Sequence, residues 1–322
     1  MKALIRDRYG PPEVLEIRDV DQPMPGEDEV LVRVHAASIN DWDWTLLRER
    51  PPFPSSLVVP WVPILGSDIA GRVVAIGKQV VKFRPGEEVY GDLSRFRSGG
   101  FGGFAQYVCA SEHALAPKPA GMTFVQAAAL PQAGQLAVQG LGANGPLTPG
   151  QKILINGAGG GVGTIGIQLA KLEDVEVTGV DSAPKLDMMQ RLGFDHVIDY
   201  RNEDFTKNGQ RYDLILDTKT SRSPLDYLRS LSPHGTYATV GDVGSRLLQL
   251  TVFGWLIRPT TRKSLRVIFL KQNRDLAYLG ERFEAGQLAP VIDGPYTLAD
   301  AREAFRHFGA GNHKGKVVIT VD

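Results

Sequence analysis

A dense run of glycines near the middle of the sequence has a clear chemical use. Gly157, Gly160 and Gly163 recur at intervals of three, and positions 159 and 161 are glycine as well. A pyrophosphate must approach backbone N–H groups at the start of a helix, where any side chain would block it. The spacing predicts a phosphate-binding turn, although a glycine loop that only brings a helix close to a sheet is the alternative. The candidate cofactor residues here are Gly157, Gly160, Gly161, Val162 and Gly163.

Acidic and basic residues follow the turn at the distance expected for the ribose end of a dinucleotide. Asp181 lies 24 residues after Gly157 and is suited to a ribose hydroxyl, whereas it would repel a 2′-phosphate. Nearby cationic and hydroxyl side chains could instead hold that phosphate. The alternatives, that Lys185 is a solvated helix residue and that Tyr200 is a core-edge residue, are as well supported by the sequence as a role in binding the phosphate. We expect NADPH, with NADH as the alternative, and add to the cofactor residues Asp181, Ser182, Lys185 and Tyr200, with Arg201 beside them.

Strands and helices must position these residues. An apolar strand at 152–156 runs into the glycine turn and a helix at 164–171 follows it. Further short apolar runs alternate with helical segments, a pattern typical of a parallel sheet covered on both faces. This βαβ context is what separates a dinucleotide turn from a chance glycine pattern. The later strands are expected at 175–180, 196–198, 212–216 and 236–240.

The rest of the chain has a different pattern of apolar and polar residues. Period-two alternation in the first third predicts strands at 30–36, 69–76, 88–90 and 105–109, with a proline-rich loop at 51–60. Thr123 is a plausible N-cap for a helix at 124–130. The chain closes with helices near 275–285 and 298–308 and a strand at 316–321. The fold class is therefore α/β, a doubly wound parallel sheet joined to a second, β-rich region.

The amino-acid composition disfavours several classes of partner and site. The 322 residues carry 36 Lys+Arg and 36 Asp+Glu, so the net charge of zero disfavours nucleic acid or an anionic membrane surface as partner. The one cysteine, Cys109, excludes an intrachain disulfide and a multi-cysteine zinc site. The N-terminal residues are soon interrupted by charge, and no apolar stretch has the ~18 residues of a spanning helix. We expect a cytoplasmic protein without membrane insertion.

Several ordered motifs carry a family resemblance. They are Ala36–Asp43, Gly66–Gly71, Pro85–Val89, Ala128–Pro131, the glycine turn, Leu192–Tyr200 and Lys314–Ile319. With these the chain resembles the medium-chain dehydrogenase/reductase superfamily, within it the zinc-independent quinone oxidoreductase branch. The segments 212–217 and 235–237 are most similar to the reticulon-interacting mitochondrial reductase type.

The resemblance implies an architecture and a reaction. Residues 1–121, completed by 266–322, would form a GroES-like catalytic domain, and 122–265 a Rossmann domain, with substrate and nicotinamide meeting between them. The expected enzyme is an NADPH-dependent homodimer that transfers hydride to a quinone or an α,β-unsaturated carbonyl. A non-catalytic NADPH-binding regulator on the same fold is the first alternative, and an alcohol dehydrogenase the second.

The resemblance also assigns residues near the reaction. The zinc-ligand positions of metal-bearing relatives fall on Asn40 and Ser67, so no metal is expected. Asn40 would hydrogen-bond the substrate or the nicotinamide ribose, or simply cap a helix. Asp43 is the second catalytic candidate, although holding its loop together is the better role for it. Lys316 would reach the cofactor or substrate, or be an exposed charge. No general acid is evident.

Three further positions bear on the cofactor, and one apolar stretch bears on the acceptor. Gly241 is expected beside the nicotinamide, and Thr218 completes the cofactor set. Relatives commonly carry a threonine where this chain has Leu136. The apolar stretch Leu247–Ile257 is either a core or dimer-contact helix or a lining for a hydrophobic acceptor.

Overall fold

The computed structural model describes residues 1–50, 62–94, 100–241, 249–254 and 261–321. The chain divides into two compact units, here called unit 1 (1–132 with 272–322) and unit 2 (133–271). These boundaries fall later in the chain than the predicted 121/122 and 265/266. Among the described residues, no helix combines the length and apolarity needed to cross a membrane.

Unit 2 is built on a parallel sheet of six strands. Their order is β10-β9-β8-β11-β12-β13, which in chain order reads 3-2-1-4-5-6, the doubly wound dinucleotide-binding order. The α/β fold class predicted from the sequence is confirmed. The strands are β8 (Lys152–Asn156), β9 (Glu176–Asp181), β10 (His196–Asp199), β11 (Tyr212–Asp217), β12 (Leu231–Thr239) and β13 (Ser264–Val267).

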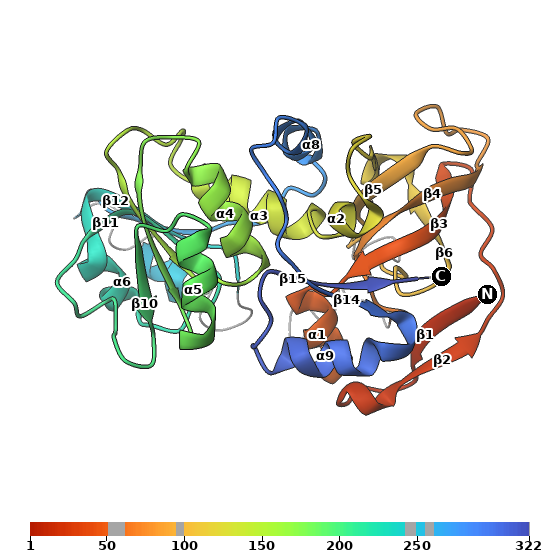
Figure 1. The fold of residues 1–322 in the computed structure, drawn as a ribbon, viewed down its shortest axis with the longest axis horizontal. Coiled ribbons are helices and arrows are strands. Elements are labelled where there is room, and N and C mark those ends of the chain that lie inside the picture. Colours follow the sequence, from red (N-terminus) through yellow and green to blue (C-terminus); the bar gives the residue numbers. More distant parts are fainter. Residues whose placement is uncertain (51–61, 95–99, 242–248, 255–260, 322) are drawn as a thin grey trace. The chain divides into compact units, whose positions relative to one another are not determined.

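The helices of unit 2 connect these parallel strands. In Figure 1, α4 and α5 lie side by side along the sheet. Helix α4 begins at Gly161 rather than at the predicted Thr164, so its first turn includes Val162 and the buried Gly163. The helix bounds are α4 (Gly161–Ala170), α5 (Ala183–Arg191) and α6 (Pro224–Ser230), and α3 (Pro131–Leu141) crosses the boundary between the units.

Unit 1 contains a mixed sheet and a separate antiparallel pair. The seven-stranded sheet has the order β14-β15-β3-β4-β5-β7, with β6 paired to β3. The last strand, β15, pairs with β3, so the C-terminal segment completes the N-terminal unit (Figure 1). The strands are β1 (Lys2–Arg6), β2 (Leu15–Asp19), β3 (Glu29–Ser38), β4 (Asp68–Ile76), β5 (Glu88–Asp92), β6 (Tyr107–Ser111), β7 (Ala116–Pro117), β14 (Ile292–Thr297) and β15 (Lys316–Thr320).

Short helices cover this sheet. Thr123 is confirmed as the N-cap of α2, where its hydroxyl accepts the backbone N–H of Gln126. Buried side chains from β3, β4, α1 and α9 share one hydrophobic core. The helices are α1 (Asp41–Arg48), α2 (Phe124–Ala128), α8 (Leu276–Glu284) and α9 (Ala301–Gly309), with 3₁₀ turns at Pro12–Val14, Glu112–Ala114 and Leu298–Asp300.

Two predicted segments fall wholly or partly outside the described residues. Residues 249–254 of the apolar stretch Leu247–Ile257 are helical, and its other residues lie outside. The proline-rich loop predicted at 51–60 lies outside as a whole.

Candidate active site

The glycine turn joins β8 to α4, and backbone packing explains its glycines. Gly157 has φ +83°, and a Cβ there would lie 2.0 Å from the Oγ1 atom of Thr218. A Cβ on Gly163 would lie 2.4 Å from the Cα atom of Ala158. The absence of these side chains allows the backbone to pack closely. It would also let a phosphate approach the backbone, because the turn leads directly into the first turn of a helix.

The start of α4 offers backbone donors. Its N-cap is Gly160, which has no side chain to cap the helix. The N–H groups of Gly161, Val162 and Gly163 belong to the first turn, where no intrahelical acceptor exists. Together with the positive end of the helix dipole, these groups are chemically suited to binding an anion at the carboxyl edge of the sheet.

Asp181, at the end of β9, is charge-compensated rather than bare. Its carboxylate accepts the N–H groups of Gly159 at 2.9 Å and Ser182 at 2.8 Å. The ammonium of Lys185 lies 3.3 Å from the same carboxylate, and both side chains are about nine-tenths or more buried. A Cβ on Gly159 would lie 2.5 Å from the Cδ of Lys185, so the lysine chain covers the glycine turn. Lys185 is therefore not a solvated helix residue.

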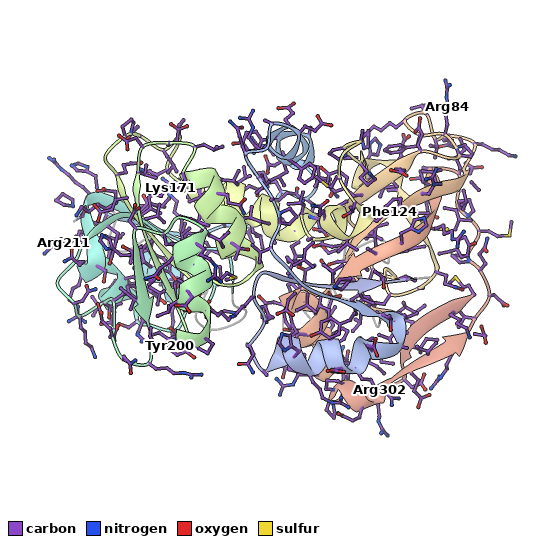
Figure 2. The ribbon with its side chains drawn as sticks, in the orientation of Figure 1. Arg84, Phe124, Lys171, Tyr200, Arg211 and Arg302 are labelled. Atoms are coloured by element: carbon purple, nitrogen blue, oxygen red, sulfur yellow. The ribbon has the colours of Figure 1, made fainter. Side chains whose placement is uncertain are left out.

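The neighbouring strand β10 ends at the same edge of the sheet. Asp199 pairs in register with Asp181, and the next residue, Tyr200, donates its N–H to the carbonyl of Asp181 at 3.1 Å. Tyr200 is 48% exposed, so it is not a core-edge residue, and the Arg201 guanidinium lies 5.7 Å from its ring centre. In Figure 2, Tyr200 and Lys171 are labelled on opposite sides of unit 2. Lys171 follows the last turn of α4.

Thr218 and Gly241 follow β11 and β12 at this edge. The Thr218 hydroxyl donates to the carbonyl of Asn156 at 3.0 Å, which fastens the end of β11 to the end of β8. A Cβ on Gly241 would lie 2.4 Å from the Thr218 carbonyl oxygen, so strand packing alone requires glycine there. The expected place of Gly241 beside a nicotinamide stays a prediction.

In unit 1, Asn40 lies in a buried polar cluster. It is the N-cap residue of α1, where it forms a capping box with Asp43, and its amide nitrogen donates to the Oγ of Ser67 at 3.1 Å. Its Oδ1 accepts from the Lys316 ammonium at 2.5 Å. Lys316 is 5% exposed and also lies 3.4 Å from the carboxylate of Asp68. The alternative of an exposed charge at position 316 is therefore wrong.

Asp43 fastens the start of α1. Its two carboxylate oxygens accept the N–H groups of Asn40 at 2.9 Å and Gly66 at 2.8 Å. The side chain is fully buried, and burial raises its pKa to about 7 against the lowering effect of these two bonds. The geometry matches a residue that holds its loop in place. Its direct part in catalysis remains a proposal.

The structure adds residues that no local sequence pattern indicated. Asp92, at the end of β5, is fully buried and lies opposite Asp68 in the antiparallel pair of β4 and β5. Gln132 donates its backbone N–H to Asp68 at 3.2 Å. Register between distant strands brings these groups together, and a single sequence does not encode that register locally.

The donor set in unit 1 is a poor match for zinc. Asn40 and Ser67 replace the nitrogen and sulfur ligands that zinc prefers, and a cationic ammonium lies among them. Burial raises the pKa of Cys109 to about 11, which disfavours the thiolate. Within the part of the chain that the structure describes, no three His, Cys, Asp or Glu side chains are grouped to hold a metal ion.

Known proteins agree with this combination of units. A family model described as "Alcohol dehydrogenase GroES-like domain" matches residues 26–120, and one described as "Zinc-binding dehydrogenase" matches residues 192–319. The chain belongs to the medium-chain dehydrogenase/reductase superfamily, in its quinone-oxidoreductase branch. The resemblance read from the sequence motifs is thereby confirmed.

Individual relatives span nearly the whole chain. "Quinone-oxidoreductase QR1, chloroplastic" of Triphysaria versicolor is 32% identical, over 99% of this chain and 98% of that protein. "NADPH-dependent alkenal/one oxidoreductase, chloroplastic" of Arabidopsis thaliana is 31% identical over 99% and 79%. "NAD(P)H oxidoreductase RTN4IP1, mitochondrial" of Bos taurus is 32% identical over 100% and 89%. The solved quinone oxidoreductase of Coxiella burnetii has a TM-score of 0.89 and 28% identity, covering 100% and 99%.

Proposed function

We propose that this protein is an NADPH-dependent reductase of quinones or α,β-unsaturated carbonyl compounds. The observation that carries the proposal is the donor-lined glycine turn at the carboxyl edge of the unit 2 sheet, with a charge-compensated acid beside it. The relatives named for quinone and alkenal/one oxidoreduction support the same reaction class.

Residues of unit 2 would hold the dinucleotide. The N–H groups at 161–163 suit the pyrophosphate, and Thr218 and Gly241 lie beyond the carboxyl ends of the central strands. When bound, NADPH supplies a hydride from C4 of its nicotinamide ring. The protein's contribution is to orient the cofactor and exclude water.

The choice of NADPH over NADH rests on Asp181. A bare carboxylate would repel a 2′-phosphate, but Lys185 at 3.3 Å compensates this charge. The Tyr200 ring and Arg201 guanidinium, which follow β10 at the same edge, add an aromatic surface and a further cation for the phosphate. These contacts support NADPH as the preferred cofactor.

Metal independence is part of the proposal. Without a Lewis acid, an isolated carbonyl or an alcohol is poorly activated for hydride transfer. A quinone or a conjugated carbonyl is already electron-poor, so positioning alone can suffice. The amide, hydroxyl and ammonium groups of Asn40, Ser67 and Lys316 support a reaction without zinc.

Stopped-flow oxidation of NADPH and NADH by the purified chain tests this function. A matched pair, cyclohexenone and cyclohexanone, separates conjugated from isolated carbonyls, and simple quinones complete the panel. We expect turnover of quinones and the enone, faster with NADPH, and none of the saturated ketone. Tight NADPH binding without turnover of any acceptor would instead indicate the non-catalytic regulator.

Assembly and location belong to the same proposal. We infer a homodimer, which is supported by the position of β13 at the edge of the unit 2 sheet, where β12 is its one partner among the described residues. Light scattering after size-exclusion chromatography measures the assembly. We also propose a cytoplasmic location, although relatives are named chloroplastic or mitochondrial. Fractionation of the source cells tests the location.

A further inference from the structure

Unit 1 buries three carboxyl groups around one ammonium group. Asp43, Asp68 and Asp92 are all 0% exposed, and Lys316 is 5% exposed. Each of these carboxyl groups is affected electrostatically by at least one other member of the group. Burying several like charges with one counter-charge is costly, and proteins avoid the cost by keeping a proton on one of them.

Lys316 uses all of its donors inside the protein. Its ammonium lies 3.2 Å from the carbonyl of Ile39, 2.5 Å from Oδ1 of Asn40 and 3.4 Å from Asp68. An ammonium group has three N–H donors and no acceptor. Lys316 therefore acts through its neighbours rather than by donating to a substrate.

The neighbour most constrained by Lys316 is Asn40. Because an ammonium only donates, the Asn40 amide must present its oxygen to Lys316 and its nitrogen to Ser67. Turning the amide over would break the hydrogen bond to Lys316, because an ammonium cannot accept one, whereas the Ser67 hydroxyl can either donate or accept. The ammonium thus fixes the orientation of the amide that the sequence motifs place near the reaction.

The three carboxyl groups are unequally supplied with donors. Asp43 accepts two backbone N–H groups, one on each oxygen. Asp68 accepts from Gln132, Ser38 and Lys316. Asp92 accepts the Ser94 N–H on Oδ1, while its buried Oδ2 has no hydrogen-bond partner among the described residues. Of the three carboxyl groups, Asp92 is the one with a buried oxygen that no described residue supplies with a donor.

Among the residues that the structure describes, few charged groups surround Asp92. Asp68 on β4 and Lys316 on β15 act on it electrostatically. The β7 and α2 segments that pack on β5 carry no ionisable side chain. The loop between β13 and α8 bonds the backbone of Asp92 through Asn273. Its charged residues are Lys271, Arg274 and Asp275, and the last two lie 4.0 Å from each other.

We propose that Lys316 is a positioning residue for Asn40, and that it fills this role while Asp92 carries a proton. Ionisation of Asp92 places a second negative charge beside Asp68, which draws the ammonium away from Asn40. Burial, reinforced by the charge of Asp68, raises the pKa of Asp92 to about 7 and thus places this change near neutral pH. The inference rests on the proposed reductase function only for its kinetic readout.

Kinetics across pH test the role of Asp92. Wild-type kcat with a quinone should fall by about tenfold per pH unit above the pKa of Asp92. Asp92→Asn, which imitates the protonated carboxyl, should remove this alkaline decline, whereas the exposed control Asp28→Asn should keep it. An Asp92→Asn profile that declines like the wild type would overturn the proposal.

Kinetics at fixed pH test the role of Lys316. Lys316→Met should lower kcat by about tenfold to a hundredfold while the Kd for NADPH stays within twofold. Lys316→Arg, which keeps the charge, should recover part of the loss, and Lys78→Met at an exposed site is the matched control. Wild-type kcat in Lys316→Met would overturn the positioning role. If Lys316→Met does not fold, the kcat of Lys316→Arg and its alkaline profile decide instead.

A spectroscopic readout separates this inference from the proposed function. Infrared difference spectra of wild type against Asp92→Asn should show the carbonyl stretch of a protonated carboxyl group at pH 6, lost by pH 9. If no acceptor is reduced, the reductase function fails, yet this band still decides the protonation of Asp92. Absence of the band at pH 6 would refute it.

Discussion

A single methyl group on Gly163 should disturb the glycine turn. The added Cβ would lie 2.4 Å from the Cα of Ala158, so the start of α4 must move away from the turn. We expect Gly163→Ala to raise the Kd for NADPH at least about tenfold, measured by titration calorimetry. Gly121→Ala is the matched control, because a Cβ there meets nothing within 4 Å. Equal affinities of the two variants would contradict a close approach of the phosphate.

Lys185 should decide between the two nicotinamide cofactors. Its removal leaves the buried Asp181 without the ammonium that lies 3.3 Å away. The uncompensated negative charge would then disfavour a 2′-phosphate, so Lys185→Ala should shift the ratio of kcat/KM for NADPH over NADH by about tenfold toward NADH. The exposed Lys207→Ala, also in unit 2, serves as control. An unchanged ratio would rule out this account of cofactor choice.

At the scale of elements, the register of β4 against β5 makes stability depend on pH. It places Asp68 and Asp92 opposite each other, and the pKa of both is raised by burial. A raised pKa means that the folded state holds its proton longer than the unfolded state does. Stability is then highest below the ordinary carboxyl pKa near 4 and declines as pH rises to about 7.

Asp92→Asn should weaken this dependence. Each unit of pKa difference contributes about 1.4 kcal/mol, so between pH 5 and 8 the variant should lose roughly 1 to 3 kcal/mol less unfolding free energy than the wild type. Urea unfolding at several pH values measures the difference. Parallel curves for the two proteins would show that Asp92 ionises freely in the folded state.

Elements that depend on local pattern could be predicted from the sequence. Strand β8 was predicted at its observed bounds because a continuous apolar run ends at a glycine turn. The pair of β1 and β2 and the edge strand β13 were missed, because short strands are defined by their pairing partners rather than by their own residues. The start of β12 was also missed, since it contains proline and glycine.

The residues of the candidate site also fall into two groups, those that local sequence pattern could predict and those that it could not. The cofactor residues follow one continuous βαβ segment, so their spacing is visible in the sequence. Asn40, Asp68, Asp92 and Lys316 come from four separate strands or strand ends, and only the sheet register brings them together. The burial of Lys316 could not be predicted, because alternation along β15 does not reveal that the carboxylate of Asp68, on β4, lies 3.4 Å from its ammonium.

At the scale of the whole molecule, the two units divide the chemistry between them. Unit 2 is one continuous stretch of chain with the dinucleotide turn, and unit 1 combines both ends of the chain around the buried polar cluster. One matched family model is described as zinc-binding, yet the amide, hydroxyl and ammonium groups of this cluster suit no soft metal ion.

We therefore expect catalysis to survive metal removal. A divalent cation would have to displace the Lys316 ammonium and bind to Asn40 and Ser67, neither of which offers a nitrogen or thiolate ligand. Elemental analysis should find less than about a tenth of a metal ion per chain, and dialysis against a chelator should leave kcat for a quinone within about twofold. A zinc alcohol dehydrogenase, treated in parallel, should lose its activity. Stoichiometric zinc whose removal abolishes turnover, and whose return restores it, would contradict the metal-free mechanism while leaving the dinucleotide site intact.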